Sequence, residues 1–303
     1  MAANLNLHLK FVLVFLTLLP FMVHSRSLKP TNGQSPEFLQ NLEGIQKGEK
    51  AKGLVAVRNY LKAFGYLKVD DPNNSNNLVK EDEFDTSMES AVKKFQQFYN
   101  LNVSGKLDSN TIKKMQMPRC GVADHVNYNG LNDLKYSFFK GNPKWPSSKF
   151  HLTYTFKSGV EVESLETMRY VFKQAFGQWS KVSRFTFEEA PVGTKADLVL
   201  GFYRGDHGDG IPFDGFGRVL AHAFAPTDGR LHFDADEQWS TNVPLQSTQT
   251  DLIWVAIHEV GHLLGLDHSS DQNAIMYALV APGVNKRTLG SDDIAGIRAL
   301  YSS

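Results

Sequence analysis

The stretch HEVGHLLGLDH, residues 258–268, decides the fold of this 303-residue chain. On a helix, His258 and His262 lie one turn apart on the same face, so both imidazoles can bind one metal ion. Gly265 follows at a point where a chain leaving a helix needs a residue that tolerates positive φ. The turn brings His268 back as a third ligand. Three protein ligands leave the fourth tetrahedral position of a zinc ion open, which is typical of catalytic zinc sites.

Glu259 follows the first histidine in sequence but points away from the metal. Zinc lowers the pKa of a bound water to about 7 and polarises a carbonyl group. A carboxylate beside it can take the proton of that water and pass it to the leaving amine of a cut peptide. A chance coincidence of the fixed letters of this motif has a probability on the order of one in ten thousand. A surface helix with unrelated histidines is therefore a poor alternative.

The stretch is similar to the extended zinc signature of the metzincins, and Ser269 after the third histidine resembles the matrixin branch. Met276 resembles the methionine of the family's Met-turn, an apolar floor beneath the metal. The resemblance covers nearly all of the chain after residue 25, without the family's C-terminal propeller domain, as in the compact plant matrixins. It implies an α+β fold: a zincin catalytic domain of a twisted, mostly parallel sheet and three helices, preceded by a small three-helix propeptide domain.

The single cysteine, Cys120, lies in the segment PRCGVAD, residues 118–124. This segment resembles the matrixin cysteine switch, with Ala123 where the family usually has proline. A thiolate is a good zinc ligand, so Cys120 would fill the open position and exclude water. Arg119 and Asp124 are expected to brace the loop as an ion pair. An inert buried thiol is the ordinary interpretation of a single cysteine, but the neighbours of Cys120 decide against it, and an odd cysteine in an exported chain is to be considered reactive or metal-binding.

A second histidine group precedes the first. His207, Asp209, His222 and His232 offer three imidazoles and a carboxylate. Four protein ligands close a zinc site, so a structural zinc is expected, and the resemblance implies the same four positions. Without the resemblance, scattered surface histidines would be the better interpretation.

Hard oxygen ligands suited to calcium lie between and after these histidines. The resemblance assigns the side chains of Asp214, Asp234 and Glu237 to a calcium ion, with the carbonyls of Gly215, Gly217 and Val219. A solvated acidic loop is the alternative. Asp197 matches a ligand of the family's second calcium site, but the loop between His222 and His232 is too short to supply the rest. Two zinc ions and at least one calcium ion are the expected cofactors.

The N-terminus predicts the compartment. Lys10 precedes the apolar run Phe11–Val23, which is too short to span a bilayer but suits a signal peptide over residues 1–25. We expect a secreted, extracellular monomer without a membrane span, in the apoplast or cell wall if the source is a plant. The formal net charge of zero gives no support for a nucleic-acid partner.

The rest of the chain divides into a propeptide, residues 26–135, and a catalytic domain, residues 136–303. Helical spacing of apolar residues runs from Leu54 to Met115, with Asp108 or Ser109 as a cap. Residues 121–149 are rich in Asn, Gly and Pro and are expected to form an exposed connector that an activating protease cuts between about 126 and 140. The further predictions are strands at 150–156, 198–202, 220–224 and 231–233, and helices at 165–179, 250–266 and 291–301, the last capped by Ser291.

Substrates are expected to be proteins or peptides of the extracellular space or cell wall. Leu220 and Ala221 lie on what should be the edge strand, where an extended peptide can pair. Trp254, one turn before His258, stands where family members control the depth of the main specificity pocket, although an ordinary core tryptophan explains it equally well. Tyr277 belongs to the wall of that pocket, where Ala278 replaces the usual proline.

Two other classes of protein compete with this interpretation. The helical part resembles small peptidoglycan-binding domains, so the chain could be a polysaccharide-binding module with vestigial catalysis. A structural zinc protein would need a fourth permanent ligand near residues 258–268, and only the removable Cys120 is available. Zinc content with and without the propeptide, coupled to peptide hydrolysis, separates the three classes.

Overall fold

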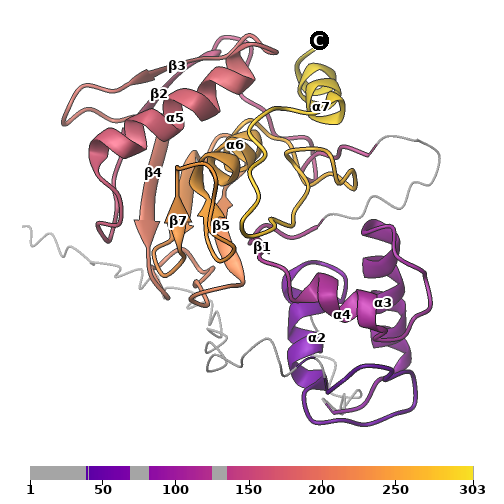
Figure 1. Cartoon of the computed structure of the whole chain (residues 1–303). Coiled ribbons are helices and arrows are strands. Elements are labelled where there is room, and N and C mark those ends of the chain that lie inside the picture. Colours follow the sequence, from indigo (N-terminus) through magenta and orange to yellow (C-terminus); the bar gives the residue numbers. More distant parts are fainter. Residues whose placement is uncertain (1–38, 40, 69–81, 125–134, 303) are drawn as a thin grey trace, which may run out of the picture.

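The computed structural model describes residues 39, 41–68, 82–124 and 135–302. The predicted signal peptide and most of the expected cleavage region lie outside these residues. Figure 1 shows a small helical body and a larger body of sheet and helices, with strand β1 at their junction.

The helical body contains the three predicted helices, which are α2 (Leu54–Ala63), α3 (Thr86–Phe98) and α4 (Ser109–Met115). Asp85 begins α3, because its side chain accepts a hydrogen bond from the Met88 amide at 2.8 Å. Asp108 begins α4 in the same way through the Thr111 amide at 2.9 Å. The apolar faces of these helices share one buried cluster, so the prediction of a small three-helix domain is confirmed.

The larger body is built on a six-stranded sheet in the order β1-β5-β6-β4-β2-β3. Its strands are β1 (Arg119–Cys120), β2 (His151–Phe156), β3 (Thr186–Glu189), β4 (Leu198–Tyr203), β5 (Val219–Ala223) and β6 (Arg230–Asp234). Every neighbouring pair is parallel except β5 and β6, which confirms the mostly parallel sheet. A separate parallel pair joins β7 (Trp239–Ser240) to β8 (Thr250–Asp251).

Helices α5 (Leu165–Ser180) and α6 (Leu252–Leu263) lie against each other and against the sheet (Figure 1). All residues of α6 are buried, and the Trp179 indole of α5 donates to the Ile257 carbonyl at 2.8 Å. Helix α6 is shorter than the predicted 250–266, because Asp251 caps it through the amides of Ile253 and Trp254.

Helix α7 (Ser291–Tyr301) has the predicted bounds but not the predicted cap. Gly290 occupies the N-cap position and Ser291 is the first helical residue, so the assignment of Ser291 as the cap is wrong. The Asp293 carboxylate accepts from the Gly290 amide at 2.7 Å, which satisfies the helix start without a serine hydroxyl.

The expectation of an exposed connector is confirmed only in part for residues 135–149, where most residues after Phe139 are exposed but Trp145 packs into the core. Trp145 is buried, and its indole donates to the Leu263 carbonyl at the end of α6 at 2.8 Å. Ser137 donates to the His268 carbonyl at 2.7 Å. Asn, Gly and Pro mark irregular backbone, but irregular backbone can still be packed once its polar groups find partners.

Candidate metal centre and active site

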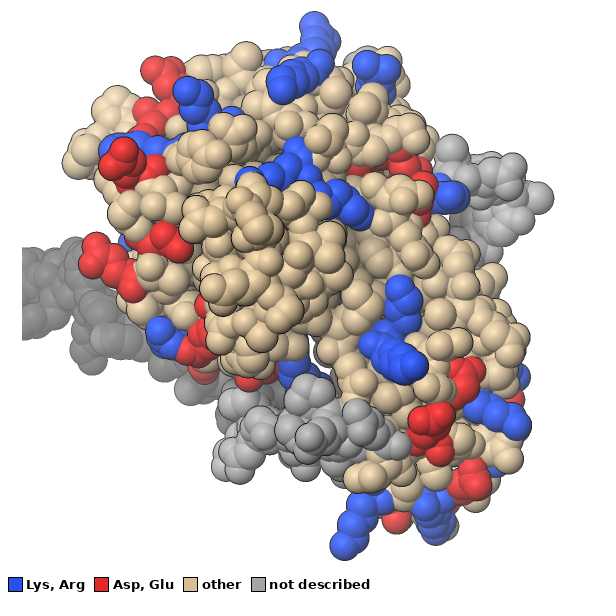
Figure 2. Space-filling model, in the orientation of Figure 1, with Lys and Arg blue, Asp and Glu red and all other residues tan. Residues whose placement is uncertain are grey.

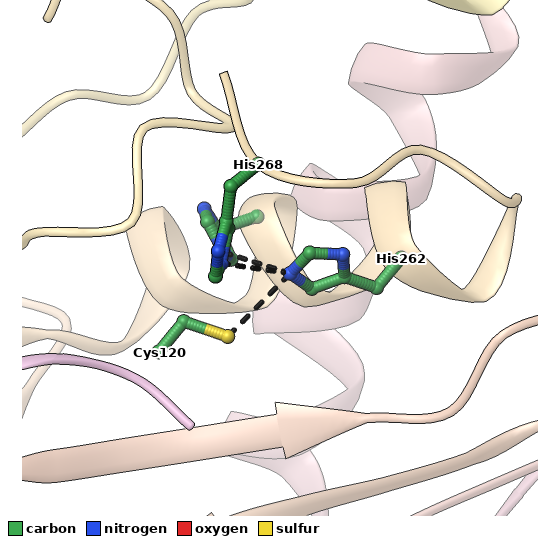
Figure 3. Close-up of side chains that lie close together, drawn as sticks. Cys120, His262 and His268 are labelled. Carbon is green, nitrogen blue, oxygen red and sulfur yellow. Dashed lines mark hydrogen bonds between the residues drawn. The ribbon is translucent and has the colours of Figure 1, made fainter. Parts of the chain in front are cut away.

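Three imidazoles of the 258–268 stretch converge on one point (Figure 3). Helix α6 carries His258 and His262 one turn apart, and their Nε2 atoms lie 3.1 Å from each other. Gly265 has a φ of 100°, which turns the chain after the helix and brings His268 back. The Nε2 atoms of His262 and His268 are then 3.2 Å apart. All three side chains are buried.

The outer ring nitrogens show that these imidazoles present lone pairs to the common point. His258 Nδ1 donates to the Ile275 carbonyl at 2.7 Å, and His262 Nδ1 donates to the Leu266 carbonyl at 2.8 Å. His268 Nδ1 donates to the Asp124 carboxylate at 2.7 Å. A neutral imidazole that donates through Nδ1 has only a lone pair at Nε2. Three lone pairs aimed at one point, two of them within 3.2 Å of His262 Nε2, repel one another unless a cation lies between them, so this donor set fits zinc.

Burial strengthens this interpretation. It lowers the pKa of His258 to about 3, with a further contribution from His268, so the imidazole is neutral at physiological pH. Metal ligation by histidine requires that neutral form.

The Cys120 sulfur is the fourth donor and lies 3.4 Å from His262 Nε2. The four donor atoms all lie within 4.8 Å of one another. Burial and the nearby Glu259 carboxylate raise the pKa of the Cys120 thiol. A metal cation among the histidines would favour the thiolate instead, because a coordinating thiol loses its proton.

Backbone pairing holds Cys120 in this place. The Arg119 amide donates to the Arg218 carbonyl and the Gly121 amide to the Ala221 carbonyl, both at 2.8 Å. On its other side, the Cys120 amide donates to the Ala278 carbonyl at 2.9 Å. Strand β1 is therefore inserted between β5 and the segment after Met276, and it covers the sheet edge expected to receive substrate.

Glu259 lies beside this cluster as a fully buried carboxylate. Neither of its oxygens has a hydrogen-bond partner among the described residues. Burial raises the pKa of Glu259 to about 8, and the adjacent Cys120 thiol offsets this in part. An unpaired carboxylate in the interior is costly in structural terms, which favours a chemical role for it.

Met276, the residue expected at the floor of the site, packs against α6 between the two helix histidines. It is buried, and its sulfur lies so close to Gly261 of α6 that a methyl group at Gly261 would overlap it. Asp293 of α7 holds the backbone around this methionine by accepting from the Ile275 and Met276 amides at 2.8 and 3.0 Å. Packing against Met276 therefore requires glycine at position 261, between the two helix ligands.

The Arg119–Asp124 ion pair predicted from the sequence is present, with Nη2 and Oδ1 2.8 Å apart and both side chains buried. Burial disfavours the charged form of Asp124, but Arg119 and His268 outweigh it and hold the pKa of Asp124 well below its usual range. The contact between Asp124 and His268 was not predicted. No spacing in the sequence signals it, because the two residues are 144 positions apart.

The second donor group also comes together. His207, Asp209, His222 and His232 place their donor atoms within 4.8 Å of one another. His207 Nδ1 donates to the Gly205 carbonyl at 2.9 Å, so its Nε2 lone pair faces the Asp209 carboxylate at 2.8 Å. Burial lowers the pKa of His232 to about 4, which keeps this imidazole neutral as well. These four donors could therefore hold a metal cation, which would offset the repulsion between the lone pairs and the carboxylate.

The carboxylates expected at calcium face a glycine-rich loop. The amides of Gly215 and Gly217 donate to Asp234 at 3.2 Å and to Glu237 at 2.6 Å. Burial and neighbouring acidic groups raise the pKa of Asp234 and of Glu237 to about 7 each. Burial likewise raises the pKa of Asp214, the third carboxylate of the set. The three carboxylates therefore lie together with too little positive charge nearby to keep their pKa values in the usual range.

Asp197, the residue considered for a second calcium, has other partners. Its carboxylate accepts from the Thr153 amide at 2.8 Å and contacts the Lys149 ammonium at 2.9 Å.

The residues predicted to contact substrate are covered or buried in this form of the protein. Leu220 and Ala221 belong to β5, whose outer edge β1 now covers. Tyr277 packs in the buried cluster of the helical body, and Lys114 of α4 donates to its hydroxyl at 3.2 Å. Trp254 is buried, with the Lys286 ammonium 5.0 Å from its ring centre.

Basic and acidic side chains are interspersed on the face shown in Figure 2. No helix among the described residues has the length and apolar character needed to cross a membrane.

The sheet is mostly parallel, and a buried helix carries two histidine donors while a third histidine follows a glycine turn. These features define a metallopeptidase of the zincin type. Residues 144–302 match a family profile described as Matrixin, and residues 50–115 match a putative peptidoglycan binding domain. The chain belongs to the matrixin family, and it is accordingly a zinc-dependent metalloendopeptidase.

Named relatives agree with this assignment. Metalloendoproteinase 1 from Glycine max is 44% identical over 264 residues, which are 84% of this chain and 83% of that protein. Metalloendoproteinase 1-MMP from Arabidopsis thaliana is 42% identical over 271 residues, 86% of this chain and 72% of that protein. Matrilysin from Homo sapiens is 39% identical over 249 residues, 81% of this chain and 84% of that protein.

Proposed function

We propose that this protein is a secreted endopeptidase made as a latent zymogen. His258, His262 and His268 would hold the catalytic zinc, and Cys120 would occupy the fourth position until the propeptide is removed. Zinc, when bound, supplies a Lewis acid that activates water and polarises the scissile carbonyl. The observation that carries the proposal is the buried, unpaired Glu259 carboxylate beside the four converging donors.

In this mechanism Glu259 acts as general base and then as general acid. Its carboxylate accepts a proton from the attacking water and returns that proton to the amine of the departing peptide. The substrate backbone pairs with β5 at Leu220 and Ala221, which becomes an edge once β1 has left. Tyr277 and Trp254 are proposed to line the specificity pocket.

Further ions complete the proposal. His207, Asp209, His222 and His232 would hold a structural zinc, because four protein ligands close the site to water. Asp214, Asp234 and Glu237, with the carbonyls of Gly215, Gly217 and Val219, would hold calcium, whose charge offsets that of the three carboxylates. We propose residues 1–25 as signal peptide, 26–135 as propeptide and 136–303 as the mature enzyme, a monomer acting on extracellular or cell-wall proteins.

The test is the substitution Glu259→Gln in the mature enzyme. We expect peptide hydrolysis to fall about 10²- to 10⁴-fold, the usual contribution of a positioned general base. Zinc content should stay at the wild-type value, because Glu259 is not a ligand. Loss of stoichiometric zinc, or turnover at the wild-type rate, would contradict the assignment. A His258→Ala variant serves as the contrast, since it should lose zinc and activity together.

A further inference from the structure

The three imidazoles of the metal centre differ in what holds their outer nitrogens. His258 and His262 donate to backbone carbonyls of the catalytic domain, at Ile275 and Leu266. His268 donates to the carboxylate of Asp124, which belongs to the proposed propeptide. Removal of the propeptide would leave the first two hydrogen bonds in place and take away the third.

The position of Asp124 is fixed by the folded helical body. Tyr66, just after α2, and Tyr99, at the end of α3, donate to Asp124 Oδ2 at 2.6 and 3.0 Å. Arg119 donates to both carboxylate oxygens at 2.8 and 3.1 Å, and its guanidinium lies 3.5 Å from the Phe64 ring centre. Asp124 therefore has little freedom to leave His268.

We infer that Asp124 is a positioning residue for the catalytic metal ligand His268, so that the propeptide retains the zinc ion as well as covering it. A carboxylate that accepts from a ligating histidine fixes the ring and makes its inner nitrogen more basic. Losing such a partner typically weakens metal binding about 10- to 100-fold. The latent form is then the form that holds zinc most firmly, through Cys120 directly and through Asp124 indirectly.

This inference rests on the proposed zinc ligation, and it goes beyond the cysteine switch. The thiolate acts at the metal, whereas Asp124 acts through His268. The two contributions can therefore be separated by working with full-length protein that lacks the thiol, Cys120→Ala.

The first experiment follows zinc transfer to an excess of chromogenic chelator. We compare zinc-loaded full-length Cys120→Ala with Cys120→Ala/Asp124→Asn. The second protein should release zinc about tenfold faster or more. The matched control is Cys120→Ala/Asp85→Asn, because Asp85 forms an ion pair with Arg58 at 3.0 Å in the same helical body but touches no metal ligand. The control should release zinc at the rate of Cys120→Ala, and equal rates for all three proteins would overturn the inference.

The second experiment needs no substitution and covers the case in which Asp124→Asn does not fold. Zinc-loaded protein with ¹⁵N-labelled histidine should show Nδ1–H signals for the three ligands, that of His268 shifted downfield by its carboxylate partner. After propeptide removal, the His268 signal should move or exchange with water while those of His258 and His262 persist. An unchanged His268 signal would refute the inference.

Failure of the inference can be told from failure of the proposed function. If His258→Ala retains full zinc at this centre, the proposed ligation itself is wrong. If His258→Ala loses zinc but neither experiment shows an effect of Asp124, only the role of Asp124 is wrong.

Discussion

Gly261 shows how a single residue links the metal motif to the fold. It lies between the two helix ligands, where a side chain would meet the Met276 sulfur and would come within 2.9 Å of the Trp179 ring. The motif therefore needs a small residue there for packing, in addition to the histidines and glutamate that it needs for chemistry. The opposite case is Gly177 in α5, where nothing lies within 4 Å of the corresponding point.

These two glycines give a matched prediction at the residue scale. Gly261→Ala should destabilise the protein by about 1–3 kcal/mol, because an added methyl group forces Met276 and Trp179 to shift. Gly177→Ala should stabilise it by about 0.5–1 kcal/mol, because alanine is the better helix former and meets no obstacle. Chemical denaturation of both variants beside wild type checks the pair. Equal effects of the two substitutions would show that packing under the histidines is looser than the structure indicates.

At the scale of elements, strand β1 is short but decides whether the site is open. It pairs with β5 on one side and with the segment after Met276 on the other. It thus covers the substrate edge with backbone while it brings the Cys120 sulfur to the histidines. Strand β1 therefore blocks the active site in two ways: the Cys120 sulfur is a ligand at the metal centre, and the β1 backbone covers the substrate edge.

Cys120→Ser separates these two parts in the uncut precursor. A hydroxyl is a poor zinc ligand, so peptide hydrolysis should rise about tenfold or more over the wild-type precursor. It should stay below that of the mature enzyme, because the backbone of β1 still lies on β5. A thiol-modifying mercurial should activate wild type and leave the variant unchanged, and a zinc chelator should abolish the new activity. A variant as silent as wild type would place latency in the steric cover alone.

The elements differ in how well the sequence predicts them. Helix α5 and strand β2 were predicted because their apolar residues recur at helical and alternating spacing, and β4, β5 and β6 because each is a short apolar run. Strand β1 was not predicted, since a two-residue strand has no period and depends on partners about 100 positions away. Strand β3 was missed because none of its residues is fully buried.

The catalytic ligands were predicted since most of them lie in one turn of helix and the loop after it. The Asp124–His268 contact arises only from tertiary folding.

At the scale of the whole molecule, a cluster of three carboxylates joins the 214–219 loop to the end of strand β6. Asp214, Asp234 and Glu237 come together from two segments, and neighbouring carboxylates contribute to the raised pKa values of Asp234 and Glu237. Their repulsion must be offset for the 214–219 loop and the end of β6 to stay together. This loop leads directly into β5, so its order bears on the substrate edge.

Removal of calcium should therefore destabilise the protein. Calcium at about 100 times its Kd stabilises the folded state by about 2.7 kcal/mol. Thermal unfolding with a calcium-selective chelator should show a lower midpoint than with excess calcium, while magnesium should restore little of the difference. Asp234→Asn should remove most of the response to calcium. An identical midpoint with and without calcium would contradict the proposed site.

The boundary between the two bodies determines where maturation can occur. From Lys135 onward the chain is already part of the catalytic body. The Tyr136 amide donates to Asp292 of α7 at 3.1 Å, and Phe138 forms a β-bridge with Leu266. Up to Asp124 the chain is held just as firmly, through Arg119 and His268. These contacts oppose cleavage from Tyr136 onward, so the activating cut should fall in the part of the 126–140 window that precedes Tyr136.

N-terminal sequencing of the active form checks this last prediction. The first residue should lie between 126 and 136, and the helical body should be released together with Cys120. Once it has left, Tyr277 loses its contacts with Lys114 and with Tyr99, whose ring centre is 5.6 Å away. Tyr277 should then be open to surface labelling in the active form and protected in the precursor. An active enzyme that begins before Cys120 would contradict both the cleavage window and the cysteine switch, because the blocking ligand would still be attached.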